Sequence, residues 1–80
     1  MKLPRDVSGA DVIRVLCRDF EYVRLDQRGS HVILHTDTPR SHRISVPDHK
    51  VMRTGTLHGI LNSVATVKGV SVDEIVDMLR

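Results

Sequence analysis

The stretch Arg28-Gly29-Ser30-His31 decides how this chain folds, because it forms a tight turn between two segments of strand-like sequence. Before it, residues 22–27 alternate polar and apolar side chains; after it, residues 31–35 are rich in strand-forming side chains. Gly29 suits the turn, since glycine adopts positive φ without a Cβ clash. The pattern predicts a β-hairpin whose second strand begins at His31.

Helix signals flank this hairpin on both sides. Ser8 is a typical N-cap, and apolar residues recur on one face of a helix that we expect from Ser8 to about Arg18. After a third predicted strand, Ser41 to Pro47, a threonine of Thr54-Gly55-Thr56 can cap a second helix that stops at Lys68-Gly69. The sequence 71–74 is a capping box for a short final helix.

This order of elements predicts an α+β fold in which a three-stranded antiparallel sheet carries helices on one face. Period-two alternation assigns apolar residues of all three strands to the helix-facing side: Val23, Leu25, Val32, Leu34, Ile44 and Val46. The opposite, solvent-facing side then collects a mixed polar set: Tyr22, Arg24, Asp26, His31, Ile33, His35, Arg43 and Ser45. Such a wet face is common in antiparallel sheets, so polarity alone does not mark a site.

The composition sets wide limits on function. Eighty residues allow a single domain, 1–80, and a net charge of +2 permits a polyanionic partner without requiring one. One cysteine, Cys17, excludes an internal disulfide, and without a signal peptide or a bilayer-length apolar run we expect a cytoplasmic protein that does not contact a membrane. With one Tyr and one Phe, the chain offers few rings on which bases could stack.

Five histidines invite a metal-site interpretation, but their spacing does not support it. His31 and His35 leave the same strand face roughly 13 Å apart at about 3.3 Å per residue, too far to share one zinc ion. We therefore expect no metal and no cofactor. A histidine beside basic groups can instead move a proton near neutral pH while arginine offsets phosphate charge, which suits cleavage of RNA through its own 2′-hydroxyl. From spacing alone, a purely structural role for His31 stays open.

Three motifs in order resemble the HicA family, also called YcfA-like, of bacterial toxin–antitoxin systems. They are Gly29-Ser30-His31, then Val46-Pro47-Asp48-His49, and then Thr54-Gly55-Thr56-Leu57 with Ile60-Leu61. The resemblance covers roughly residues 6–61 and, more loosely, 69–79. The sequence departs from the family at Phe20-Glu21, where Gly-Phe is frequent, and at residues 63–68, which are longer than the usual link between the last two helices.

The resemblance implies a double-stranded-RNA-binding-domain-like fold and a metal-independent mRNA interferase, an endoribonuclease that inhibits translation. It assigns His31 as the single catalytic histidine and implies two partners, an mRNA substrate and a HicB-type antitoxin. We expect RNA contacts at Arg28, Gly29 and Ser30, which match the motif, and at Arg24 and Arg43 on the predicted wet face. Pro47 and His49 match a motif without a defined role. The alternative is a catalytically inactive module that binds RNA or the antitoxin.

Overall fold

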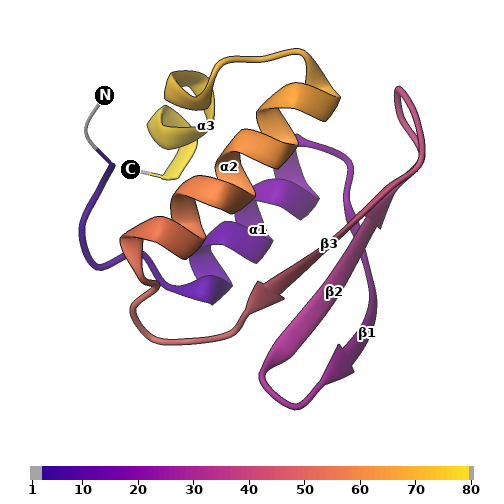
Figure 1. Cartoon of the computed structure of the whole chain (residues 1–80). Coiled ribbons are helices and arrows are strands. Elements are labelled where there is room, and N and C mark those ends of the chain that lie inside the picture. The colour runs from indigo at the N-terminus through magenta and orange to yellow at the C-terminus, as the bar shows by residue number, and fades with distance from the viewer. Residues whose placement is uncertain (1–2, 80) are drawn as a thin grey trace.

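The computed structural model describes residues 3–79, which form a helix, three strands and two further helices (Figure 1). The helices are α1 (Gly9–Asp19), α2 (Thr54–Lys68) and α3 (Val72–Leu79). The strands are β1 (Val23–Arg28), β2 (His31–Thr36) and β3 (His42–Pro47), paired antiparallel in the order β1-β2-β3. The predicted elements are confirmed, with ends close to those expected.

The three helices form a layer on one side of the sheet (Figure 1). Both α1 and α2 contact β3, and α3 packs against α1 and α2. This arrangement confirms the predicted α+β class and is consistent with a double-stranded-RNA-binding-domain-like fold. The core between the layers is built from aliphatic side chains of all three helices and of β2 and β3, among them Val12, Val15, Leu16, Val32, Leu34, Val46, Leu57, Leu61, Val64 and Ile75.

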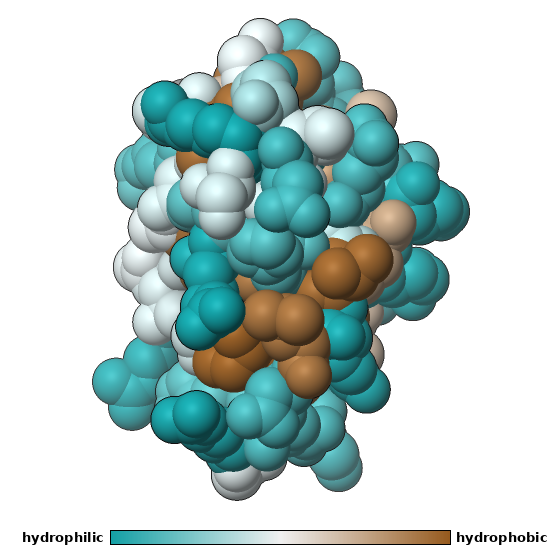
Figure 2. Space-filling view, turned by 90° about the vertical axis from the view of Figure 1, so that its right-hand side faces the viewer, coloured by the Kyte–Doolittle hydropathy of each residue, from teal (hydrophilic) through white to brown (hydrophobic). Residues whose placement is uncertain are grey.

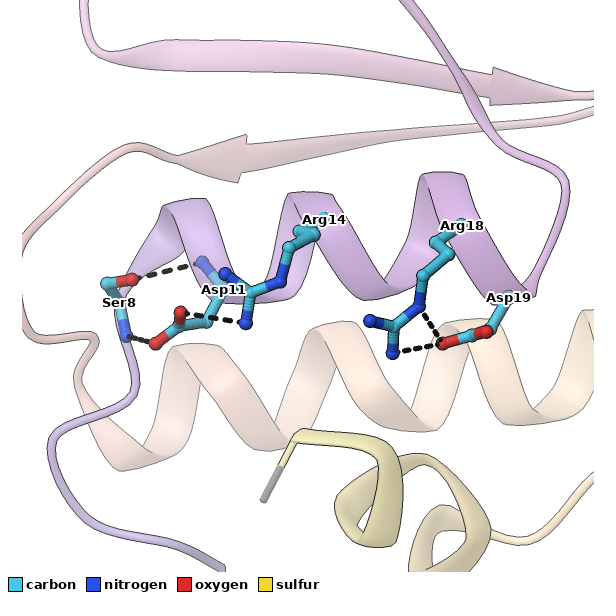
Figure 3. Close-up of polar contacts among 5 residues, drawn as sticks. All are labelled: Ser8, Asp11, Arg14, Arg18 and Asp19. Carbon is cyan, nitrogen blue, oxygen red and sulfur yellow. Dashed lines mark hydrogen bonds and ion pairs between the residues drawn. The ribbon is translucent and has the colours of Figure 1, made fainter.

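The first turn of α1 is fixed by a capping box (Figure 3). The Asp11 backbone N–H donates to Ser8 Oγ at 3.0 Å, and the Ser8 N–H donates to Asp11 Oδ2 at 3.2 Å. These bonds, above all the one from the Ser8 backbone, lower the pKa of the Asp11 carboxyl. Arg14 lies 3.3 Å from Asp11, and farther along Arg18 pairs with Asp19 at 2.7 Å (Figure 3). The local sequence therefore fixes where this helix begins.

The two later helices follow their signals with one exception. The N-cap of α2 is Arg53, which makes no side-chain cap hydrogen bond, so the predicted threonine cap is wrong: Thr54 already lies inside the helix. The helix ends at Gly69 with φ of 69°, as predicted, and residues 63–68 belong to α2 rather than to a longer link. The predicted capping box of α3 is confirmed, because the Glu74 N–H donates to Ser71 Oγ at 3.1 Å.

The face assignment of β1 is wrong. Val23 pairs with His35 on the outer side and is 57% exposed, Leu25 is 50% exposed, and Tyr22, predicted on the wet face, is 2% exposed. A bulge between Arg24 and Asp26 makes Leu25 an extra residue, after which Asp26, opposite Ile33, and Arg28, opposite His31, lie on the outer side. Each of the two alternating sets of side chains in β1 and the residue before it contains an apolar member. Burial of the Tyr22 ring, the largest of these side chains, determines which set faces the helices.

Tyr22 is buried because its hydroxyl has a partner. It hydrogen-bonds to His42 Nδ1 at 2.8 Å, and the Lys68 ammonium lies 5.0 Å from the centre of its ring. Lys68 Nζ also donates to Thr36 Oγ1 at 2.9 Å. Burial, reinforced by the charges of Arg40 and Lys68, lowers the pKa of His42. This cluster ties the end of α2 to the end of the sheet remote from His31.

Candidate functional site: a depression lined by two histidines

His31 is the first residue of β2 and its side chain is exposed. It lies between Arg28 of β1 and Pro47 of β3 in the sheet register. The preceding turn depends on Gly29, whose φ is 60°, and the carbonyl of Ser30 accepts a 2.6 Å hydrogen bond from the Asp48 N–H. Paired backbone on both sides therefore holds the histidine, as the hairpin prediction required.

The His31 side chain lines a surface depression of about 440 Å³ where the end of β3 meets the first turns of α2. Its polar walls come from four separate segments, and its apolar floor comes from residues near the core. We call this feature the histidine depression; it is lined by His31, Ser45, Pro47, His49, Met52, Arg53, Thr56 and Ile60. The site therefore combines two imidazoles, one guanidinium and two hydroxyl groups.

The segment that carries His49 is tied to α1. The Gly9 N–H donates to the His49 carbonyl at 2.8 Å, and the Met52 N–H donates to the Val7 carbonyl at 2.8 Å. A Cβ on Gly9 would lie 2.0 Å from the Pro47 carbonyl oxygen, so only glycine permits this approach. The backbone on which His49 sits is thus fixed by direct contact with the start of the first helix.

A second hollow lies on the outer face, the side of the sheet away from the helices. It has a volume of about 510 Å³ and is lined by Leu25, Asp26, Arg28, Ile33 and Arg43. Figure 2, which looks onto the side of the molecule where β1 and β2 lie, shows hydrophobic side chains gathered among hydrophilic ones. Arg28 pairs weakly with Asp26 at 3.4 Å. The outer face thus joins an apolar centre to exposed arginines.

The structure brings most of the predicted site residues together, but not all. Gly29 and Ser30 form the turn beside His31, and Arg28 and Arg43 lie together on the outer face. Arg24 pairs with Leu34, whose side chain points to the helices, and its charge acts on the Cys17 thiol of α1. The expectation that it shares the wet face with His31 is therefore wrong.

Two residues of the depression were not predicted as site residues: Arg53 was not singled out in the sequence, and Thr56 was noticed only as part of a motif. Arg53 and Thr56 flank the start of α2, and only the approach of this helix to the end of β3 brings them beside His31. The available signal was the position of Arg53 directly before Thr54-Gly55-Thr56, where a cation adjoins a helix start. His49 was noticed as part of a motif, and its wall position gives that motif a location.

Neither Cys17 nor a group of metal-ligating side chains contributes to the site within the part of the chain that the structure describes. Cys17 is partly buried in α1, and burial raises the pKa of its thiol. Within residues 3–79, no group of three or more His, Cys, Asp or Glu side chains is placed to hold a metal ion. No helix in this part of the chain is long and apolar enough to cross a bilayer. The histidine depression is the feature that joins the sequence motifs.

The fold and the depression define a small α+β domain, consistent with a double-stranded-RNA-binding-domain-like arrangement, in which an exposed histidine lines the same depression as an arginine. Comparison with known families agrees: the family model described as "HicA toxin of bacterial toxin-antitoxin" matches residues 9–64, more than half of the chain. The chain therefore belongs to the HicA toxin family of type II toxin–antitoxin systems. Searches of curated proteins and of solved structures gave no match.

Proposed function

We propose that this HicA-family toxin is a metal-independent mRNA interferase and that His31 is its catalytic residue. The observation that carries this proposal is the position of His31, exposed on fixed backbone in the wall of a depression that also contains Arg53. The depression suits a backbone segment of single-stranded RNA better than a stacked base, because none of the residues that line it is Phe, Tyr or Trp.

RNA cleavage fits these groups because the nucleophile belongs to the substrate. The 2′-hydroxyl lies next to the phosphate that it attacks, so the protein has to supply a base, an acid and positive charge. His31 can take the 2′-hydroxyl proton near neutral pH. Arg53 can offset the charge that develops on the phosphate oxygens, and Arg28 with Arg43 can hold flanking phosphates. Gly29 and Ser30 present backbone groups at the turn beside the same RNA.

The test is His31→Ala, produced without antitoxin. His31 is exposed, so the free energy of unfolding should change by no more than about 0.5 kcal/mol, whereas loss of a base should slow RNA cleavage roughly 100-fold to 10,000-fold. Growth, RNA cleavage in the presence of a chelator and thermal melting are measured together. His58→Ala, an exposed histidine on α2, is the matched control. A variant that stays toxic and still cuts RNA refutes the catalytic role of His31. A wild-type toxin that binds RNA or the antitoxin without cutting RNA would instead support the non-catalytic binding module.

We further propose that a HicB-type antitoxin neutralises the toxin by covering the outer face together with His31. The outer face exposes Val23 and Leu25 beside the half-buried Ile33, and an apolar centre of this kind suits a protein partner better than RNA. Arg28 and Arg43 at its rim favour an acidic partner. Bound there, the antitoxin would withdraw both the base and its cationic neighbours from substrate.

Leu25→Glu tests this surface, with Val51→Glu as the control, because Val51 is 56% exposed on the loop before α2. Leu25→Glu should weaken antitoxin binding at least tenfold, about 1.4 kcal/mol, while Val51→Glu should bind the antitoxin as the wild-type toxin does. Hydrogen exchange of the complex should show protection at residues 28–33. Equal affinities for the two variants, or a tight complex without that protection, would place the antitoxin elsewhere.

A further inference from the structure

The five histidines divide into two groups by their contacts. His35 hydrogen-bonds to Ser41 Oγ at 3.1 Å, His42 bonds to Tyr22 and His58 bonds to Asn62 at 3.3 Å. Within residues 3–79, His31 and His49 make no such side-chain contact, and these two line the histidine depression. Imidazoles that hold no other side chain in place are free to act on a bound ligand. Because His31 and His49 line the same depression, we consider the chemistry of the two histidines together.

Hydrogen bonds tie together the backbone segments that carry the two histidines. Asp48, directly before His49, donates to the carbonyl of Ser30, directly before His31, at 2.6 Å. On its other side, the His49 carbonyl accepts from Gly9 at 2.8 Å. Neither residue therefore sits on a loop that is free to move away from the other. The two backbone segments are thus held together by hydrogen bonds, and both imidazoles line one depression, as a cooperating pair requires.

Besides His31, the depression is lined by one other imidazole, that of His49. Its remaining polar side chains are an arginine and two hydroxyl residues, and guanidinium and hydroxyl groups are poor proton donors as residue types. An imidazolium, by contrast, releases a proton readily at neutral pH. Cleavage through the 2′-hydroxyl needs a second proton transfer, to the departing 5′-oxygen, and His31 cannot serve as both base and acid within one concerted step.

We infer that His49 is the general acid that complements His31, an inference that rests on the interferase activity proposed above. His31 removes the proton from the 2′-hydroxyl, and the 2′-oxygen forms a bond to the adjacent phosphorus. The bond from phosphorus to the 5′-oxygen breaks as the His49 imidazolium protonates that oxygen. The products are a 2′,3′-cyclic phosphate and a free 5′-hydroxyl, with His31 left protonated and His49 neutral. Exchange with water restores both.

The test separates acid from base through the leaving group. An oligoribonucleotide that the wild-type toxin cuts is compared with the same molecule carrying sulfur in place of the 5′-oxygen at the cut site. A departing thiolate needs no proton, so loss of the acid should matter only for the natural substrate. His49→Ala should slow cleavage of natural RNA roughly 100-fold to 10,000-fold and cut the sulfur analogue at close to the wild-type rate. His31→Ala should be slow on both substrates, and His58→Ala on neither.

Each other outcome has a distinct meaning. If His49→Ala cuts natural RNA normally while His31→Ala is inactive, the inference fails and the proposed interferase stands. If His49→Ala is slow on both substrates, His49 does not act as the acid. If His31→Ala remains active, the catalytic role proposed for His31 fails, and the acid–base pair fails with it. Thermal melting accompanies each assay, and His49→Gln, which keeps a polar side chain without an acidic proton, replaces the alanine variant should that variant not fold.

Discussion

Gly9→Ala should destabilise the toxin strongly, although alanine is the best helix former and Gly9 is the first residue of α1. The added Cβ would lie 2.0 Å from the Pro47 carbonyl oxygen, 2.8 Å from Asp48 Cα and 2.9 Å from Pro47 C. All three are backbone atoms, which no rotamer change can move aside. Because non-bonded atoms pack best about 3.5 Å apart, α1 and the end of β3 must separate by roughly 1 Å or more.

The expected loss follows from three contributions. Overpacking costs about 1–3 kcal/mol, and the 2.8 Å bond from Gly9 to the His49 carbonyl, worth about 1 kcal/mol, is strained or broken. The smaller entropy of the unfolded alanine chain offsets about 0.4–1 kcal/mol. A net loss of about 2 kcal/mol should lower Tm by roughly 8–16 °C in a domain of this size.

Gly59→Ala is the matched control, because it makes the same substitution in the interior of α2, where a Cβ would meet nothing within 4 Å. It should raise the free energy of unfolding by about 0.5–1 kcal/mol. In calorimetry and urea denaturation, the change in the free energy of unfolding should therefore be negative for Gly9→Ala and positive for Gly59→Ala. A Gly9→Ala protein that melts at or above the wild-type temperature would refute the close approach of α1 to the end of β3, and with it the fixed position of His49.

Three further predictions concern the cap, the polar cluster and the RNA. Ser8→Ala removes the N-cap acceptor of α1 and should cost about 1 kcal/mol by urea denaturation; no change would mean that Asp11 holds the helix start without it. The lowered pKa of His42 means that the unfolded chain binds its proton more readily, so stability should fall as pH drops below the ordinary value of 6.5. Melting curves of His42→Asn should show a weaker decline, and an identical decline would contradict this origin. Affinity for a non-cleavable RNA should fall as the salt concentration rises. A plot of the logarithm of the binding constant against the logarithm of the salt concentration should have a slope of about −2 if Arg28, Arg43 and Arg53 each contact a phosphate. An affinity independent of salt would exclude phosphate contacts.

Most of the secondary structure could be predicted because its signals are local. The turn at Gly29 adopts the positive φ that the sequence demanded, Gly69 ends α2 in the left-handed region, and Ser8 caps α1. Each of these features depends on a few consecutive residues and on no distant contact. The hairpin, in turn, fixed the face of His31, since alternation along β2 is undisturbed.

The face of β1 could not be predicted from such signals. Along residues 22–27, either of the two alternating sets of side chains could face the helices. Which set does so depends on contacts with residues far away in the sequence. The Tyr22 N–H donates to the Leu16 carbonyl at the end of α1, and the Tyr22 hydroxyl finds His42 twenty residues away. The bulge at Leu25 then shifts the register once more. These distant contacts are the reason that the outer face exposes apolar side chains. The surface that we propose for the antitoxin therefore could not be predicted from the sequence.

The histidine depression could not be predicted for a similar reason, and its origin shows how structural residues position the proposed site. The hairpin pattern was enough to predict the position of His31. His49 and Arg53 line the same depression only because the segment after β3 packs against the start of α1. That packing requires Gly9, whose missing side chain admits the Pro47 carbonyl and whose N–H holds His49. A substitution there, at a residue that does not line the depression, should therefore impair RNA cleavage as well as stability, because it displaces the segment carrying the inferred acid.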